Sequence, residues 1–310
     1  MSLKVIRDPQ AGAPETVLAI GAFDGIHRGH RALFARVVEQ ARVEGRVPAV
    51  LTFEPLPREH LFPASAPPRL SSVGARLAAF AESGIEIAFL CRFNAAFAGL
   101  TPAAFAERLR LLHGARHVWV GEDFRFGARR AGDVAFLRDE GRRLGFTVNT
   151  LSTVDDGDGR ISSTRVRAAL SAGDMAQAAK LLGHPYAMCG RVVHGAKLGR
   201  TLGFPTANVA LPRGRPPMTG IYAVRCSGAS TRGLEGVASL GYKPAVGHTG
   251  PATLEAFLFD FSGDLYGRRL TIEFLKKLRE EENFPSLDAL VAQMQRDCDA
   301  ARDHFRSQAP

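Results

Sequence analysis

Short apolar segments alternate with amphipathic helical segments through the first half of this chain, and that alternation restricts the possible fold more than any other feature. The apolar segments are rich in Val, Ile and Phe and lie at 17–21, 47–53, 85–90, 117–120 and 146–151. Helical patterns lie between and after them, at 29–44, 72–82, 101–112, 132–144, 162–171 and 174–182. Strands that alternate with helices of this length are joined by crossover connections, so the sequence predicts a parallel sheet in an α/β domain.

The pattern changes beyond residue 183. Strand-like segments at 186–193, 220–226 and 252–261 are separated by turns rich in Gly and Pro, and no long helical pattern returns before Ser286. A helix then follows, with Ser286 as its candidate N-cap. Its apolar stripe is Leu287, Leu290, Val291, Met294, Cys298, Ala301 and Phe305. We therefore expect two domains, an α/β domain over residues 1–183 and a small β-barrel with a C-terminal helix over residues 184–310.

Charge and cysteine usage narrow the possible partners and compartments. The 40 basic and 31 acidic residues give a net charge of +9, which suits an anionic partner such as a nucleotide or polyphosphate. The charge is dispersed, with no basic tail and no patch interleaved with aromatics, so nucleic-acid binding is not expected. No apolar run approaches the roughly 20 residues of a membrane helix, and the first fifteen residues lack a signal-peptide core. A cytoplasmic location is therefore expected, with the four scattered cysteines as free thiols.

Residues 19–30, Ala-Ile-Gly-Ala-Phe-Asp-Gly-Ile-His-Arg-Gly-His, follow the first strand and open the first helix. In open α/β sheets, ligands bind at the carboxyl ends of the strands, where a helix N-terminus offers unpaired N–H groups to phosphate. The glycines at 21, 25 and 29 allow a nucleotide to approach the backbone closely. His27 and His30 are three residues apart, so both can project from one side of the first helical turn as donors to a phosphate under attack.

Two further segments lie where ligand-contacting loops are expected. Residues 121–127, Gly-Glu-Asp-Phe-Arg-Phe-Gly, follow the fourth strand, and residues 161–167, Ile-Ser-Ser-Thr-Arg-Val-Arg, begin a helix. Hydroxyl groups at a helix start cap the backbone or bind phosphate, and guanidinium groups match phosphate oxygens. Taken alone, the first segment is equally compatible with a turn whose two phenylalanines lie in the core.

At these positions the chain resembles the H-x-G-H nucleotidyltransferases, and within them the FAD synthetase half of the bacterial bifunctional riboflavin kinase/FMN adenylyltransferases. The resemblance implies an ATP site in which His27 and His30 contact the phosphates. It also implies that Asp123 and Phe126 bind the flavin, and that Ser162, Thr164 and Arg167 hold the leaving pyrophosphate. The remaining implied ATP contacts are Gly21, Phe23, Asp24 and Gly29, although Asp24 is as suited to capping or positioning. Leu56 stands where the family often has histidine, so no role is carried over there.

The second half carries another glycine-rich segment, over residues 190–208, which ends in Phe-Pro-Thr-Ala-Asn. In an extended chain residues two apart share a face, so Thr206 and Asn208 present two neutral oxygens in one direction. Mg²⁺ takes few protein oxygens and completes its shell with phosphate and water. The segment resembles the riboflavin kinase motif, which implies that Thr206 and Asn208 bind Mg²⁺. Gly195, Gly199 and Gly203 are the implied ATP contacts.

A lone glutamate lies in the strand-like segment near residue 255. Glu255 shares a strand face with Phe257 and Phe259, and a carboxylate beside aromatic rings is partly desolvated and a better base. Together with Gly263-Asp264-Leu265-Tyr266-Gly267 it resembles the riboflavin kinase segment whose glutamate is the general base. The chain departs from the family at 239–245, Ser-Leu-Gly-Tyr-Lys-Pro-Ala, and at Ala256-Phe257, which puts the strength of kinase activity in doubt.

The resemblance implies an enzyme that converts riboflavin and ATP to FMN, and then FMN and ATP to FAD and pyrophosphate, with Mg²⁺. Two alternatives remain within the same resemblance: an adenylyltransferase with weak or lost kinase activity, and a non-catalytic flavin- or nucleic-acid-binding regulator. An aminoacyl-tRNA synthetase fragment also carries H-x-G-H, but this chain lacks Lys-Met-Ser-Lys-Ser. A homo-oligomer is possible on this reading.

Overall fold

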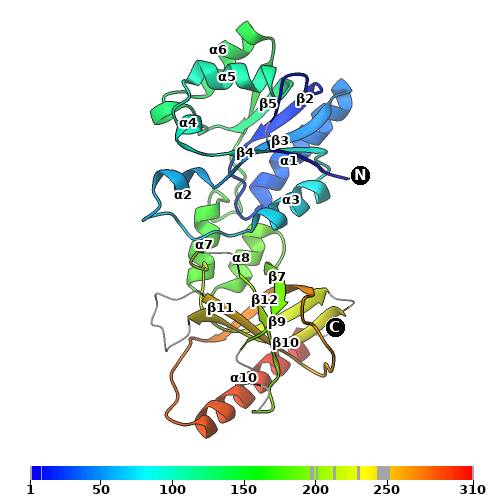
Figure 1. Cartoon of the computed structure of the whole chain (residues 1–310), viewed down its shortest axis with the longest axis vertical. Helices are drawn as coiled ribbons and strands as arrows, with labels where there is room; N and C mark the ends of the chain where they lie inside the picture. Colours follow the sequence, from blue (N-terminus) through cyan, green and yellow to red (C-terminus); the bar gives the residue numbers. More distant parts are fainter. Residues whose placement is uncertain are drawn as a thin grey trace. The chain divides into compact units, whose positions relative to one another are not determined.

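The computed structural model describes residues 2–7, 9–195, 199, 202–211, 214–228, 231–242 and 252–308. The chain forms two compact units, which we describe one at a time (Figure 1). The first unit comprises Met1–Pro67 and Val73–Ser162, and the second comprises Pro68–Ser72 and Ser163–Pro310. This division groups α7 (Ser163–Ser171) and α8 (Met175–Leu182) with the second unit. The sequence-based boundary at residue 183 follows α8 and stays a prediction about the functional halves.

A six-stranded parallel sheet forms the centre of the first unit, in the order β1-β4-β3-β2-β5-β6. Its strands are β1 (Lys4–Ile6), β2 (Thr16–Ile20), β3 (Val47–Glu54), β4 (Ile87–Arg92), β5 (Ala115–Gly121) and β6 (Thr147–Leu151). Every residue of β2 is buried, as expected for a central strand covered on both faces. The α/β fold predicted from the alternating pattern is confirmed.

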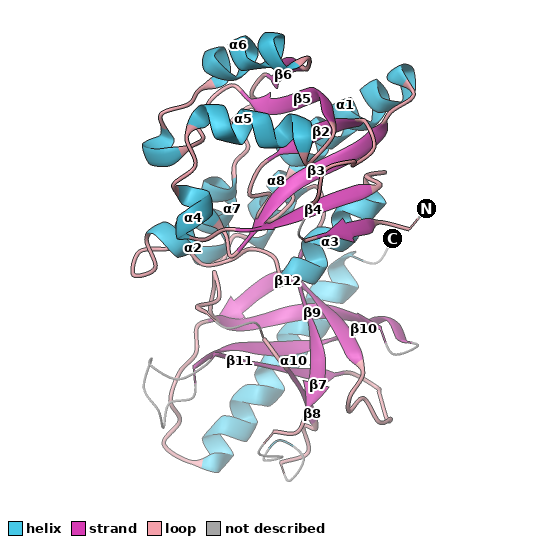
Figure 2. Ribbon diagram, turned by 45° about the horizontal axis from the view of Figure 1, so that its top comes forward, coloured by secondary structure: helices cyan, strands magenta, loops and turns pink. Residues whose placement is uncertain are grey.

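Helices cover both faces of this sheet (Figure 2). The helices described in this unit are α1 (Arg28–Glu44), α2 (Pro57–Leu61), α3 (Val73–Glu82), α4 (Ala95–Ala98), α5 (Pro102–Leu111) and α6 (Val134–Leu144), with a short 3-10 turn at Ala128–Arg130. One apolar core contains Phe34 and Val37 of α1 with Phe80 of α3, and the other contains Leu109 of α5 with Leu137 of α6. The sheet therefore separates two apolar layers, which is the doubly wound arrangement.

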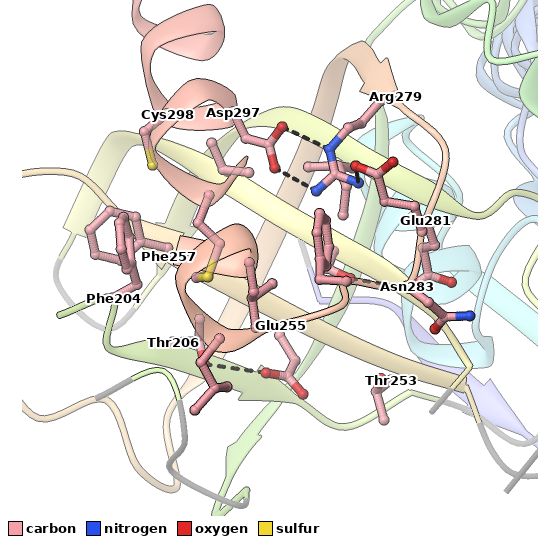
Figure 3. A pocket seen from close by; sticks show the side chains of 18 of the residues that line it. Phe204, Thr206, Thr253, Glu255, Phe257, Arg279, Glu281, Asn283, Asp297 and Cys298 are labelled. Atoms are coloured by element: carbon pink, nitrogen blue, oxygen red, sulfur yellow. Dashed lines mark hydrogen bonds and ion pairs between the residues drawn. The ribbon is translucent and has the colours of Figure 1, made fainter. Parts of the chain in front are cut away.

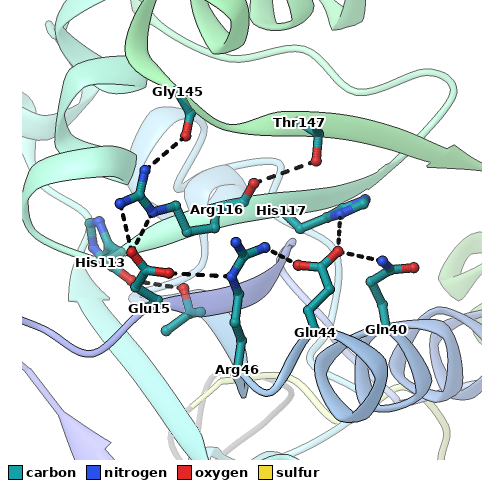
Figure 4. A network of polar contacts seen from close by, with 10 residues as sticks. Glu15, Gln40, Glu44, Arg46, His113, Arg116, His117, Gly145 and Thr147 are labelled. Atoms are coloured by element: carbon teal, nitrogen blue, oxygen red, sulfur yellow. Dashed lines mark hydrogen bonds and ion pairs between the residues drawn. The ribbon is translucent and has the colours of Figure 1, made fainter.

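A polar network fastens the amino ends of the central strands (Figure 4). Glu15 accepts hydrogen bonds from Arg116 Nε at 2.7 Å and from Arg46 Nε at 3.4 Å. Glu44, at the end of α1, pairs with Arg46 and contacts His117 Nδ1 at 3.0 Å. The hydrogen bond from Arg116 is the main reason that the pKa of Glu15 lies below its usual value. This network ties β2, β3 and β5 together at the edge opposite their carboxyl ends.

The second unit is a closed six-stranded barrel in the order β10-β11-β8-β7-β12-β9. Its strands are β7 (Tyr186–Val193), β8 (Thr206–Val209), β9 (Gly220–Gly228), β10 (Thr231–Tyr242), β11 (Ala252–Leu258) and β12 (Arg269–Arg279). Along β11 the residues Leu254, Ala256 and Leu258 are buried, whereas Glu255 and Phe257 alternate with them on the other face. The predicted barrel is confirmed, and its inner and outer faces follow the strand period.

A C-terminal helix, α10 (Leu287–Gln308), packs on the outside of this barrel. It begins where the sequence predicts, because the Ser286 hydroxyl accepts a hydrogen bond from Ala289 N–H at 3.2 Å. Cys298, Ala301 and Phe305 form a small core with Phe259 and Ala223 of the barrel. All four cysteines are free thiols, as expected. Helix α10 does not pack against the barrel along its whole length, and a cavity lies between the two.

Candidate active sites

The turn that follows β2 brings two histidine rings together at the start of α1. His27 is the N-cap of the helix, and its Nδ1 accepts a hydrogen bond from the His30 N–H at 3.3 Å. The two imidazole rings are stacked, with centroids 3.6 Å apart and an interplanar angle of 17°. The spacing of three residues therefore does place both rings on one side of the first helical turn.

The environment of His30 keeps its ring neutral. Burial, and next the neighbouring His27, hold the pKa of His30 well below its ordinary value. Its Nδ1 is buried, and no hydrogen-bond partner reaches it from the part of the chain that the structure describes. A neutral imidazole has one N–H donor and one acceptor nitrogen. Burial and the nearby His27 ring therefore both favour the neutral form of this imidazole.

The ring of Phe23 packs against the ring of His30. Its ring meets the His30 ring edge to face at 5.3 Å and 88°, and its side chain is only 2% exposed. Gly21 lies against the same ring, because a Cβ at residue 21 would come within 2.8 Å of Phe23 Cε1. Phe23 was predicted among the ATP contacts, but its buried side chain packs in the core. Asp24 is also buried, and a Cβ at Gly29 would lie 3.2 Å from His27 Nδ1.

The two predicted flavin contacts in the 121–127 loop, Asp123 and Phe126, differ in their exposure to solvent. Asp123 is exposed and forms an ion pair with Arg160 at 2.8 Å, which holds the pKa of Asp123 below its usual value. Phe126 is only 6% exposed and packs 5.1 Å from the Phe105 ring. The structure thus favours the core alternative for Phe126, because a ring enclosed by other side chains cannot stack on a ligand without moving. Flavin contact by Asp123 stays a prediction.

The predicted pyrophosphate contacts fall on both sides of the division between the units. Ser162 ends the first unit, whereas Thr164 and Arg167 lie in α7 of the second. Thr164 is exposed, and Arg167 Nε donates to the carbonyl oxygen of Pro68 at 2.7 Å. Their convergence on one phosphate group stays a prediction.

A cavity of about 630 Å³ lies between the barrel and α10 (Figure 3). Thr206 of β8 and Glu255 of β11 both line it, and the Thr206 hydroxyl donates to Glu255 Oε2 at 3.3 Å. In the antiparallel register Glu255 lies opposite Asn208, and Phe257 lies opposite Thr206. Directly opposed residues share a face. Thr206 and Asn208 therefore lie on one face of the barrel, as their spacing predicts, and the pairing of β8 with β11 adds Glu255 to that face.

Two of the three glycines in the kinase-like motif lie against these polar side chains. A Cβ at Gly195 would come within 2.4 Å of the Asn208 amide, and a Cβ at Gly199 would lie 2.3 Å from the carbonyl oxygen of Phe204 and 3.4 Å from Thr206 Oγ1. Gly203 has a φ of +87°, which disfavours any other residue. Residues 196–198, 200 and 201 lie outside the described part of the chain. The glycines thus permit a close approach of backbone to Thr206 and Asn208.

The far wall of the cavity contains a buried ion pair that the sequence reasoning missed. Asp297 of α10 is 5% exposed and accepts two hydrogen bonds from Arg279, at 2.8 Å from Nε and 2.7 Å from Nη2. Phe204, Phe257 and Met294 supply apolar lining. The signal in the sequence is the position of Asp297, three residues after Met294 and four before Ala301, which puts it beside the apolar stripe of the C-terminal helix.

Within the described residues, no group of three or more His, Cys, Asp or Glu side chains is arranged to hold a metal ion. Thr206 and Asn208 present oxygens beside the Glu255 carboxylate, and oxygen is the donor that Mg²⁺ prefers. This set fits a cation that is held mainly by phosphate and water. None of the described helices is both long and apolar enough to cross a membrane.

The fold and the two sites define a two-domain nucleotide-handling protein, with stacked histidines in an α/β unit and a Thr/Asn/Glu set in a barrel. Comparison with known proteins agrees with this class. The family model of FAD synthetase matches residues 10–165, and that of riboflavin kinase matches residues 182–305. The chain belongs to the bifunctional riboflavin kinase/FMN adenylyltransferase family.

Named relatives span nearly the whole chain. A bifunctional riboflavin kinase/FMN adenylyltransferase of Escherichia coli K12 is 45% identical over 96% of this chain and 94% of its own length. One from Pseudomonas fluorescens is 46% identical, with 92% of each chain covered. A crystal structure titled as a macrolide-efflux protein from Streptococcus pneumoniae covers 97% of this chain and 99% of its own, with a TM-score of 0.80 and 30% identity. The resemblance drawn from the motifs is thereby confirmed.

Proposed function

We propose that this chain is a bifunctional flavin-cofactor enzyme whose two reactions occur at the two sites just described. In the barrel, riboflavin and ATP give FMN and ADP. In the α/β unit, FMN and ATP give FAD and pyrophosphate. Family membership over nearly the full length supports both activities.

The hydrogen bond between Thr206 and Glu255 is the observation that carries the kinase assignment. It puts a carboxylate beside a hydroxyl oxygen in the lining of a cavity large enough for a flavin. Glu255 accepts the proton of the riboflavin 5′-hydroxyl as that oxygen forms a bond to the γ-phosphorus of ATP. The bond from that phosphorus to the ADP oxygen breaks, and ADP leaves. Thr206 and Asn208 would hold Mg²⁺, which neutralises phosphate charge when bound.

The adenylyl transfer needs no protein nucleophile. An FMN phosphate oxygen forms a bond to the α-phosphorus of ATP, the bond to pyrophosphate breaks, and the protein aligns the groups and neutralises charge. The stacked rings of His27 and His30 at the start of α1 support a role for both imidazoles on the ATP phosphates. One well-placed donor of this kind is worth about 3–4 kcal/mol in a transition state. Ser162, Thr164 and Arg167 are proposed to bind the leaving pyrophosphate.

The two-site assignment is tested by separating flavins after incubation with riboflavin, ATP and Mg²⁺. We expect the wild-type chain to form both FMN and FAD. We expect Glu255→Ala to stop FMN formation while still converting supplied FMN to FAD, and His30→Ala to accumulate FMN without FAD. Loss of both activities in each folded variant would contradict the assignment.

A further inference from the structure

A buried arginine lies beneath the histidine-bearing turn of the first unit. Arg76, on α3, is only 1% exposed. Its Nη1 donates to the carbonyl oxygen of Ala22 at 3.1 Å, to Thr52 Oγ1 at 3.1 Å and to the carbonyl oxygen of Phe53 at 3.2 Å. Its Nη2 donates to Glu54 Oε2 at 2.7 Å. One side chain thus joins the carboxyl ends of β2 and β3, where an open α/β sheet binds its ligand.

The chemistry of this contact set favours arginine over lysine. A guanidinium is planar and always charged, so it can donate in several fixed directions at once, whereas a lysine ammonium acts as a compact point charge. The Glu54 carboxylate, whose side chain is 31% exposed, compensates the buried positive charge. Burying such a charge is costly unless it is paired and hydrogen-bonded. The pairing with Glu54 leaves Nη1 to hold backbone carbonyls.

The contact between Arg76 and Ala22 is linked to His30 through a single residue, Phe23. The Ala22 carbonyl oxygen receives two donors, Arg76 Nη1 and, at 3.2 Å, the Thr52 hydroxyl. The next residue, Phe23, has a φ of +50°, a strained value for a non-glycine residue, so surrounding contacts must hold it there. The Phe23 ring in turn packs edge to face on the His30 imidazole. The orientation of the Ala22 peptide therefore determines where the ring beneath His30 lies.

We propose that Arg76 is a positioning residue for adenylyl transfer, which acts by holding the Ala22 carbonyl so that Phe23 fixes the His30 ring. The inference rests on the function proposed above for the histidine site. Arg76 is buried beneath the histidine-bearing turn, and its side chain acts by holding the backbone of that turn. Its loss is expected to lower the rate of the chemical step more than the apparent affinity for ATP. We expect the loss of Arg76 to leave the riboflavin kinase reaction of the other unit unchanged.

The test compares Arg76→Met and Arg76→Lys with wild type in both reactions. Displacement of a catalytic group by about 1 Å can cost about 100-fold in rate. We therefore expect Arg76→Met to lower kcat for FAD formation from FMN by about 10- to 100-fold, with KM for ATP changed less than threefold. Arg76→Lys is expected to restore part of the rate. Arg143→Met is the matched control, because Arg143 is half exposed and pairs with Glu140 and Glu107 on the surface.

Three readouts separate positioning from general destabilisation. Fluorescence of Trp119, the single tryptophan, shows at assay temperature whether the first unit is folded. NMR titration of the imidazoles is expected to show the pKa of His30 rising toward its ordinary value in Arg76→Met. Thr52→Val removes the other donor to Ala22, and its effect on kcat is expected to be non-additive with that of Arg76→Met.

A failure of the role proposed for Arg76 can be distinguished from a failure of the proposed function. Wild-type protein without adenylyl transfer would contradict the proposed function itself. A folded Arg76→Met variant with wild-type kcat, or with an unaltered His30 titration, would overturn the positioning role alone. Equal loss of both reactions would also overturn it.

Discussion

Replacing Asp297 by asparagine is expected to loosen the C-terminal helix from the barrel and weaken riboflavin phosphorylation. Asp297 Oδ1 accepts from Arg279 Nε at 2.8 Å and from Gln293 Nε2 at 2.9 Å, and Oδ2 accepts from Arg279 Nη2 at 2.7 Å. Asparagine keeps the shape and one acceptor oxygen but replaces the other with a donor facing a guanidinium. The variant therefore breaks a buried bidentate pair without opening a cavity.

The magnitude follows from the burial of the two partners. Removing one partner of a buried ion pair costs about 3–5 kcal/mol. The Arg279 side chain is 20% exposed and has a second acidic neighbour, Glu282 at 3.3 Å, so the lower end of this range applies. We expect a loss of about 3 kcal/mol in the unfolding free energy of the second unit. For a unit of this size, that loss lowers Tm by about 6–12 °C.

Calorimetry and kinase assays check this expectation together. Since Arg279 and Asp297 both line the cavity, KM for riboflavin is expected to rise, whereas conversion of supplied FMN to FAD stays unchanged. The matched control is Asp299→Asn, two residues further along α10, where an exposed carboxylate accepts a hydrogen bond from Gln295 on the same helix. The reasoning would be refuted if Asp297→Asn lowered the Tm of the second unit by less than about 2 °C, or if Asp299→Asn lowered it by the same amount as Asp297→Asn.

Three further expectations concern the two units separately. Burial lowers the pKa of His113 to about 4, so the unfolded chain binds more protons there and stability is lost as pH falls from about 6.5 to 4, by up to about 1.4 kcal/mol per pH unit. Urea unfolding followed by Trp119 fluorescence is expected to show this slope in wild type and a flatter one in His113→Gln. Gly195→Ala is expected to displace the Asn208 amide and lower kinase kcat about 10- to 100-fold, with adenylyl transfer of supplied FMN unchanged; equal kinase rates would contradict the contact. Phe126→Ala is expected to destabilise the first unit by about 3–5 kcal/mol in the same unfolding assay, and a change in flavin affinity without loss of stability would argue against its core position.

The elements that the sequence predicts best are those whose own residues carry the signal. The central strands β2 to β6 and helices α1, α5 and α6 lie within a few residues of the predicted segments, because fully buried strands are continuously apolar and surface helices carry one apolar stripe. The strands missed are β1, β10 and β12. β10 contains Gly233, Gly236 and Gly241, so its strand state depends on pairing with β9 and β11 rather than on local preference. β12 ends in a segment rich in charged residues and depends in the same way on pairing with β7 and β9.

By itself, the sequence determined the fold class and the shared face of Thr206 and Asn208, since these follow from periods of two and about four residues along the chain. It also carried the two nucleotide motifs, which were found through their resemblance to known families. Tertiary structure alone decided which motif side chains face a cavity and which are enclosed. Phe126 lies in the core, Asn208 lies against Gly195, and Arg76 and Asp297 are paired with residues 18 or more positions away. Burial and charge pairing depend on what distant segments bring together, and no local pattern carries that information.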